Sequence, residues 1–161
     1  MALTADANFS SIGTPLKAPF SCNAADTFYQ GAIVFTDAGG GVQVTHAATL
    51  DRVLGISPKQ QVTTAAADIV EVYVKGTFWV PVGSNISAAD EGDMLMLDAS
   101  ETSTDDFADT VAMMDTGTYT AAIHDSVVGQ ILRVTSTQML IHLLPGFTGR
   151  ALVTTTTNIW T

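Results

Sequence analysis

The stretch "IVEVYVKGTFWVPV", residues 69–82, decides the fold class. Its even-numbered positions are apolar apart from one glycine: Val70, Val72, Val74, Gly76, Phe78, Val80 and Val82. Its odd-numbered positions include Glu71, Lys75 and Thr77. Alternation with a period of two is typical of a β-strand that buries one face. A straight strand of this length would exceed the usual ~3–10 residues, so we expect a bend at Gly76 that keeps the same parity on both sides.

Shorter strands are predicted on both sides of this one, over residues 32–36, 42–45, 53–56, 94–97, 128–135 and 138–144. "DAGGGVQV", residues 37–44, has the glycines of a turn between two antiparallel strands. Residues 103–114 instead favour a short helix, capped by Ser103 and Asp106. Its apolar face would carry Phe107, Val111 and Met114. Short strands with frequent turns predict an all-β protein, a compact barrel or sandwich.

One element of the sequence occurs twice. "GAIVFTDA", residues 31–38, matches "GDMLMLDA", residues 92–99, and each follows an Ala-Ala-Asp. Further along, "VLG" at 53–55 matches "VVG" at 127–129, and "FWVPVG" at 78–83 resembles "IHLLPG" at 141–146. The chain is therefore predicted to hold two similar β units in one domain, residues 24–146. The units cover about 24–83 and 88–146, with an insertion at about 100–121 in the second.

The two ends of the chain differ from this domain. Residues 1–23 lack periodicity and contain Pro15 and Pro19, so we expect an extended N-terminal arm. Its apolar side chains would lie on its own barrel or on a neighbour: Phe9, Ile12, Leu16 and Phe20. Residues 147–161 form a short C-terminal tail that includes Trp160.

The strand "MLML", residues 94–97, is apolar on both faces. Met94 and Met96 alternate with Leu95 and Leu97, so neither face suits water. Such a strand belongs at the centre of the body or in a contact between subunits.

The charge of the chain restricts its partners. Six Lys and Arg against sixteen Asp and Glu give a net charge of −10, which disfavours nucleic acid as a direct partner. Charged residues make up 14% of the chain, against about 25% in ordinary globular domains. Either Thr and Ser solvate a free β-protein, or other subunits cover much of the surface, since the cores of interfaces are depleted of charge.

Motifs for catalysis or cofactors are not visible in the sequence. His124, Asp125 and Ser126 are consecutive, which points them to alternate sides of an extended chain, and no Gly-x-Ser-x-Gly elbow occurs. Cys22 is a single cysteine and the histidines are isolated, so zinc is not expected. The acidic residues of 98–109 leave a weak calcium site open. No leader and no apolar run of the ~20 residues that a membrane helix needs is seen, so we expect a soluble protein without membrane or cofactor.

The order of these segments resembles one known family. "GAIVFTDA", "RVLGIS", "VEVYVKGTFWVPV", "AADEGDMLMLDA", "VVGQILRV" and "MLIHLLPG" follow the pattern of bacteriophage capsid cement, or head-decoration, proteins. "VKGTFWVPV", residues 74–82, and "AADEGDMLMLD", residues 88–98, fit best. The resemblance covers about residues 15–146, and the insertion and the tail depart from it.

This resemblance implies a compact β fold that assembles, usually as a homotrimer, on the outer surface of the virion. There it would bridge neighbouring subunits of the major capsid protein and stabilise the capsid, without enzymatic activity. The arm would reach a partner by strand addition or by inserting apolar side chains. The predicted partner contacts are Phe9, Ile12, Pro15, Leu16, Phe20, Met94, Met96 and Trp160.

The sequence leaves two other functions open. A virion adhesin or host-glycan binding module would use an aromatic platform, for which Trp79 beside Tyr73 is the candidate. A trimeric β-barrel enzyme with a site between subunits would need a convergent set of acid, base or metal ligands.

Overall fold

The computed structural model describes residues 6–36, 40–44, 52–82, 86–97, 111–113 and 127–144. In these ranges the strands pair in antiparallel sheets, and the helical structure is one 3₁₀ turn, η1 (Ala88–Asp90). The predicted all-β fold class is therefore confirmed.

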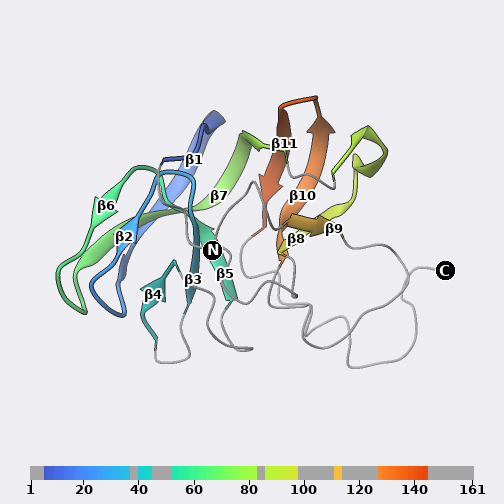
Figure 1. The fold of residues 1–161 in the computed structure, drawn as a ribbon. Helices are drawn as coiled ribbons and strands as arrows, with labels where there is room; N and C mark the ends of the chain where they lie inside the picture. The colour runs from blue at the N-terminus through green and yellow to red at the C-terminus, as the bar shows by residue number, and fades with distance from the viewer. Residues whose placement is uncertain are drawn as a thin grey trace, which may run out of the picture.

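One large sheet contains most of the described strands (Figure 1). Its order is β4-β3-β5-β7-β11-β10-β8-β9, and β1 pairs with the other edge of β7. The strands are β1 (Ser10–Ser21), β3 (Ile33–Thr36), β4 (Val42–Gln43), β5 (Arg52–Ile56), β7 (Ile69–Pro81), β8 (Met94–Leu97), β9 (Val111–Met113), β10 (Val127–Val134) and β11 (Gln138–Leu143). β2 (Thr27–Phe28) and β6 (Gln61–Val62) form a separate two-stranded sheet.

Most predicted strands match the observed ones to within one or two residues. β3 and β4 pair antiparallel on either side of the predicted glycine turn, of which residues 37–39 lie outside the described part. The helix predicted at 103–114 is wrong at its end, because Val111–Met113 is strand β9, paired with β8. Pairing with β8, the "MLML" strand of the same chain, favours a strand here over the helix that the weak helical pattern predicted. Residues 103–110 and Met114 lie outside the described part.

The long strand β7 turns at Gly76. Burial keeps the same parity along it, since Val70, Val72, Phe78 and Val80 are all buried. Gly76 has φ +153°, and a Cβ there would lie 2.8 Å from the Cβ of Pro15 in β1. Even-numbered side chains are thus buried on both sides of Gly76, as predicted, and the register of β1 against β7 shifts between Leu16 and Lys17, which pair with Lys75 and Tyr73.

The aromatic rings next to Gly76 show the effect of this turn. Tyr73 and Phe78 are five residues apart and would lie on opposite faces of a straight strand. Their ring centroids are nevertheless 5.3 Å apart. The first part of β7 contacts β5, where Tyr73 pairs with Ile56, whereas residues 76–81 pair with β11. β7 thus joins the part of the sheet that contains β5 to the part that contains β11.

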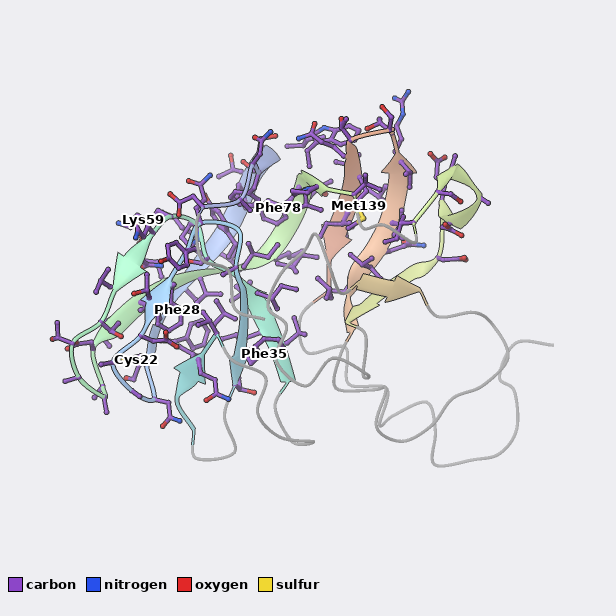
Figure 2. All side chains as sticks on the ribbon, viewed as in Figure 1. Cys22, Phe28, Phe35, Lys59, Phe78 and Met139 are labelled. Atoms are coloured by element: carbon purple, nitrogen blue, oxygen red, sulfur yellow. The ribbon has the colours of Figure 1, made fainter. Side chains whose placement is uncertain are left out.

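Two hydrophobic cores lie on the two sides of β3 and β5. The smaller core contains Cys22, Phe28, Ala32, Val34, Val42, Val44, Val70 and Val72. The larger core contains Ile33, Phe35, Val53, Ile56, Phe78, Val80, Ile86, Leu95, Val128, Ile131, Met139, Ile141 and Leu143. Figure 2 labels Cys22 and Phe28 in the first, and Phe35, Phe78 and Met139 in the second. β3 is buried on both faces, which explains its uninterrupted apolar run.

The strand order has the same plan in its two halves. β4-β3-β5-β7 is followed by β11-β10-β8-β9, and the halves meet where β7 pairs with β11. A glycine occupies the same place in each half. A Cβ on Gly55 of β5 would collide with the carbonyl oxygen of Tyr73, and one on Gly129 of β10 with that of His142. Both strands therefore need glycine for close backbone approach.

Candidate interaction surface

The N-terminal segment lies on its own sheet. Residues 10–21 form β1 and pair antiparallel with β7, so they are extended, as predicted for this segment. Phe9 stacks on Phe78 at 5.3 Å between ring centroids and contacts Tyr73 at 6.0 Å. Phe20 packs against the smaller core. Among the predicted partner contacts, Phe9 and Phe20 therefore contribute to the cores of this chain.

No described strand pairs with the edge of β1 that lies away from β7, and two prolines protect this open edge. The backbone N–H and C=O of Glu71 both bond the side chain of Gln61, at 2.7 and 2.9 Å, on the side of β7 away from β1. Pro19, opposite Glu71, is therefore in a non-hydrogen-bonded pair, and its ring nitrogen faces the open edge. Pro15 lies in a bulge between Ile12 and Leu16. Prolines and bulges both hinder the addition of another strand.

The large sheet also has a partly exposed face. It lies on the side of β7, β11 and β10 that points away from the larger core. Residues that pair directly across antiparallel strands share a face. Trp79 pairs with Leu140, and Thr77 pairs with both His142 and Ile12. We call this surface the outer face and define it by Ile12, Thr77, Trp79, Gln130, Leu132, Arg133, Leu140 and His142. Their strand neighbours Phe78, Ile131 and Ile141 are fully buried in the larger core.

A β-bulge shapes one end of the outer face. The register of β10 against β11 shifts between Ile131 and Arg133, so Leu132 and Arg133 together oppose Leu140. A bulge of this kind directs both of its residues to one side of the sheet. Leu132 is 44% exposed and Ile12 is 50% exposed. These two apolar side chains therefore stand at the water-facing surface.

Three polar side chains of the outer face bond one another or the backbone. The hydroxyl of Thr77 lies 3.0 Å from Nδ1 of His142, and the amide of Gln130 donates to the carbonyl of Gly92 at 2.8 Å. His142 has no described carboxylate partner that would orient it as a general base.

Metal ligands do not gather in the described part of the chain. In those ranges no group of three or more His, Cys, Asp or Glu side chains could hold an ion. The acidic segment 98–109, the candidate for weak calcium binding, lies outside them. Among the same residues, no helix is long and apolar enough to span a membrane.

The remaining predicted contacts are placed as follows. Leu16 is 58% exposed on β1, and Pro15 is half-buried beside Gly76. Met94 and Met96 belong to β8, and their side chains lie outside the described part. Trp160 lies outside it altogether.

Sequence reasoning missed Leu132 and Arg133 as surface residues. The signal was available in "QILRV", where Ile131 and Leu132 are adjacent apolar residues and break the alternation of β10. A second apolar residue out of phase is typical of a bulge.

Comparison with models of protein families and with curated proteins finds no match for this chain.

Proposed function

We propose that this chain is an accessory structural protein that decorates the outer surface of a bacteriophage capsid. It would bridge neighbouring subunits of the major capsid protein and stabilise the particle, with the virion surface as its location. The observation that carries the proposal is the outer face, which exposes Ile12 and Leu132 and has Arg133 as the one charged residue of its defining set, on a protein with a net charge of −10. Such a face is suited to a protein contact.

The two segments that resemble decoration proteins best belong to strands that form or border the outer face. "VKGTFWVPV" is the second part of β7, which carries Thr77 and Trp79. "AADEGDMLMLD" contains η1 and β8, next to β10 in the sheet. η1 begins with a capping box, in which Ser87 and Asp90 bond each other's backbone N–H. The resemblance is therefore best in β7, which carries part of the outer face, and in β8, which pairs with β10 of that face.

The partners follow from the same features. The proposal includes a homotrimer that binds the major capsid protein, without catalysis, cofactor, membrane or direct contact with nucleic acid. Many individually weak contacts on a closed lattice would add up to firm binding. The acidic charge keeps the protein from phosphates.

Co-sedimentation with capsids tests this function. The purified chain is mixed with expanded, empty heads of the phage that encodes it, and with unexpanded heads as the control. We expect saturable binding to expanded heads at a fixed ratio to major capsid subunits, and a higher melting temperature of the decorated heads. Pelleting no greater than that of an unrelated acidic protein would refute the proposal.

The glycan-binding alternative has less support from the geometry. Its platform needed Trp79 and Tyr73 side by side, but Tyr73 packs with Phe9 and Phe78 against the larger core. Trp79 remains half-buried on the outer face. Binding to a glycan that Trp79→Ala abolishes would restore this alternative.

A further inference from the structure

We propose that the three lysines of this chain form a docking site for an acidic segment of a protein partner. The site lies on β1, on the first part of β7 and on the turn before β6, and it shares no residue with the outer face. In the setting of the proposed function, the acidic segment would belong to the major capsid protein, and that assignment rests on the proposed function. Two observations carry the site itself: the gathering of the lysines, and an exposed apolar side chain beside them.

All the lysines of the chain gather around one carboxylate. Lys17 of β1 and Lys59 of the turn before β6 each lie on Glu71 of β7, with Nζ 3.6 and 3.8 Å from the same carboxylate oxygen. Figure 2 labels Lys59. Lys75 follows Glu71 by four residues on β7, which is about 13 Å along an extended strand and on the same face. We call Lys17, Lys59, Glu71 and Lys75 the lysine patch.

The charge of the lysine patch is opposite to that of the chain. Three ammonium groups against one carboxylate leave a local charge of +2, whereas the whole chain has a net charge of −10. Glu71 is shared by two lysines, and Lys75 makes no ion pair within the described residues. The side chains of all three lysines are exposed. The patch therefore holds positive charge that its own surroundings do not neutralise, and carboxylates of a partner would complement it.

An exposed leucine beside the lysines favours a protein segment as the occupant. Leu16 pairs with Lys75 across β1 and β7, and it is 58% exposed. Residues that pair directly across antiparallel strands share a face, so Leu16 belongs to the same surface as the patch. An acidic protein segment can offer an apolar side chain to Leu16 and carboxylates to the lysines. Nucleic acid would gain phosphate contacts from three lysines only, and the remaining acidic surface would repel it.

Fluorescence anisotropy of a labelled peptide of six glutamates tests the lysine patch on the full chain. The salt concentration is about 0.1 M, at which charges more than about 10 Å away are largely screened. We expect saturable binding of this peptide and no binding of a peptide of six glutamines. Lys17→Gln, Lys59→Gln and Lys75→Gln should each weaken binding about two- to fivefold, and the triple variant at least about tenfold.

Two further variants are matched to these. Thr137→Asp lowers the net charge by the same one unit, at the exposed turn between β10 and β11, so it should leave the affinity for the peptide unchanged. Glu71→Gln removes the carboxylate that two lysines share, so it should strengthen binding about two- to fivefold. Circular dichroism shows whether each variant folds.

Absence of peptide binding, equal weakening by Thr137→Asp, or weaker binding by Glu71→Gln would overturn the docking site. Tighter binding of a labelled hexathymidylate would overturn the choice of a protein segment over phosphates. Pelleting with expanded heads separates these results from the proposed function. Peptide binding without pelleting refutes the function and leaves the docking site standing. Pelleting that the triple variant does not weaken leaves the function standing and refutes the assignment of the acidic segment to the capsid protein.

Discussion

Single residues set the closest contacts of this fold. Gly129 is one of them, since β10 approaches β11 so closely that any side chain there would meet the carbonyl of His142. Asp68 is another, because it closes the turn before β7 by accepting the N–H groups of Thr64 and Ala65 at 2.8 and 3.1 Å. Each makes a prediction about stability.

Gly129→Ala is expected to destabilise the protein by about 2 kcal/mol or more, because the two strands must separate or the backbone must distort. Thr137→Ala, at an exposed turn position, is the control and should change stability by no more than about 0.5 kcal/mol. Urea denaturation gives both values. Equal midpoints for the two variants would contradict the close approach.

The stability contributed by Asp68 should depend on pH. The N–H of Thr64, followed by that of Ala65 and the Thr64 hydroxyl, lowers the pKa of Asp68 below its ordinary value of 3.8. A lowered carboxyl pKa stabilises the folded state above the ordinary value, and the contribution is lost as the pH falls through the folded pKa. Asp68→Asn should therefore melt at a lower temperature than wild type at neutral pH, and the difference should shrink in acid. A difference that stays constant with pH would argue against this role.

At the scale of elements, one side chain bonds the backbone of β7 at a position where a neighbouring strand would otherwise pair. The backbone of Glu71, on the side of β7 away from β1, is satisfied by the amide of Gln61. The same amide donates to the hydroxyl of buried Ser57 at 3.1 Å. One side chain thus joins β6, β7 and the segment after β5.

Gln61→Ala should cost about 1–3 kcal/mol, since it leaves the Glu71 backbone without a partner. Gln60→Ala, at the exposed neighbouring position, is the matched control and should be nearly neutral. Chemical denaturation measures both, and hydrogen exchange at Glu71 should accelerate in the first variant only. Unchanged protection of that amide would contradict the assigned bond.

The edge strand β1 also makes a prediction. Pro19→Thr restores an N–H on the open edge, where the proline now blocks strand addition. We expect faster aggregation on heating, followed by light scattering, with Pro58→Thr, outside the strands, as the control. Equal aggregation of both variants would show that the edge needs no protection.

The whole molecule is held together by β7, which borders both cores. Val70 and Val72 belong to the smaller core, and Phe78 and Val80 to the larger one. Since one continuous strand serves both, neither core should unfold without the other.

Substitutions in the two cores should therefore shift one common transition. Phe28→Ala in the smaller core should cost about 3–5 kcal/mol, and Met139→Ala in the larger core about 2–5 kcal/mol. Differential scanning calorimetry is expected to show a single peak for wild type and for both variants. Two resolved peaks, with only one moved by each substitution, would mean that the cores unfold separately.

The sequence by itself determined the all-β class, the places of most strands and the burial of even-numbered side chains along β7. Those features depend on period-two alternation and on glycine, which are local properties of the chain. Only the tertiary structure decided three other features. Phe9 and Phe20 pack on the cores of their own chain, β1 lies at an edge of the sheet, and Val111–Met113 pairs with β8. An apolar side chain in an extended segment suits its own core and a partner equally well, and the spacing of residues does not distinguish them. The outer face likewise exists only after β7, β11 and β10 pair, because cross-strand register brings Trp79, Leu140 and Arg133 to one side of the sheet.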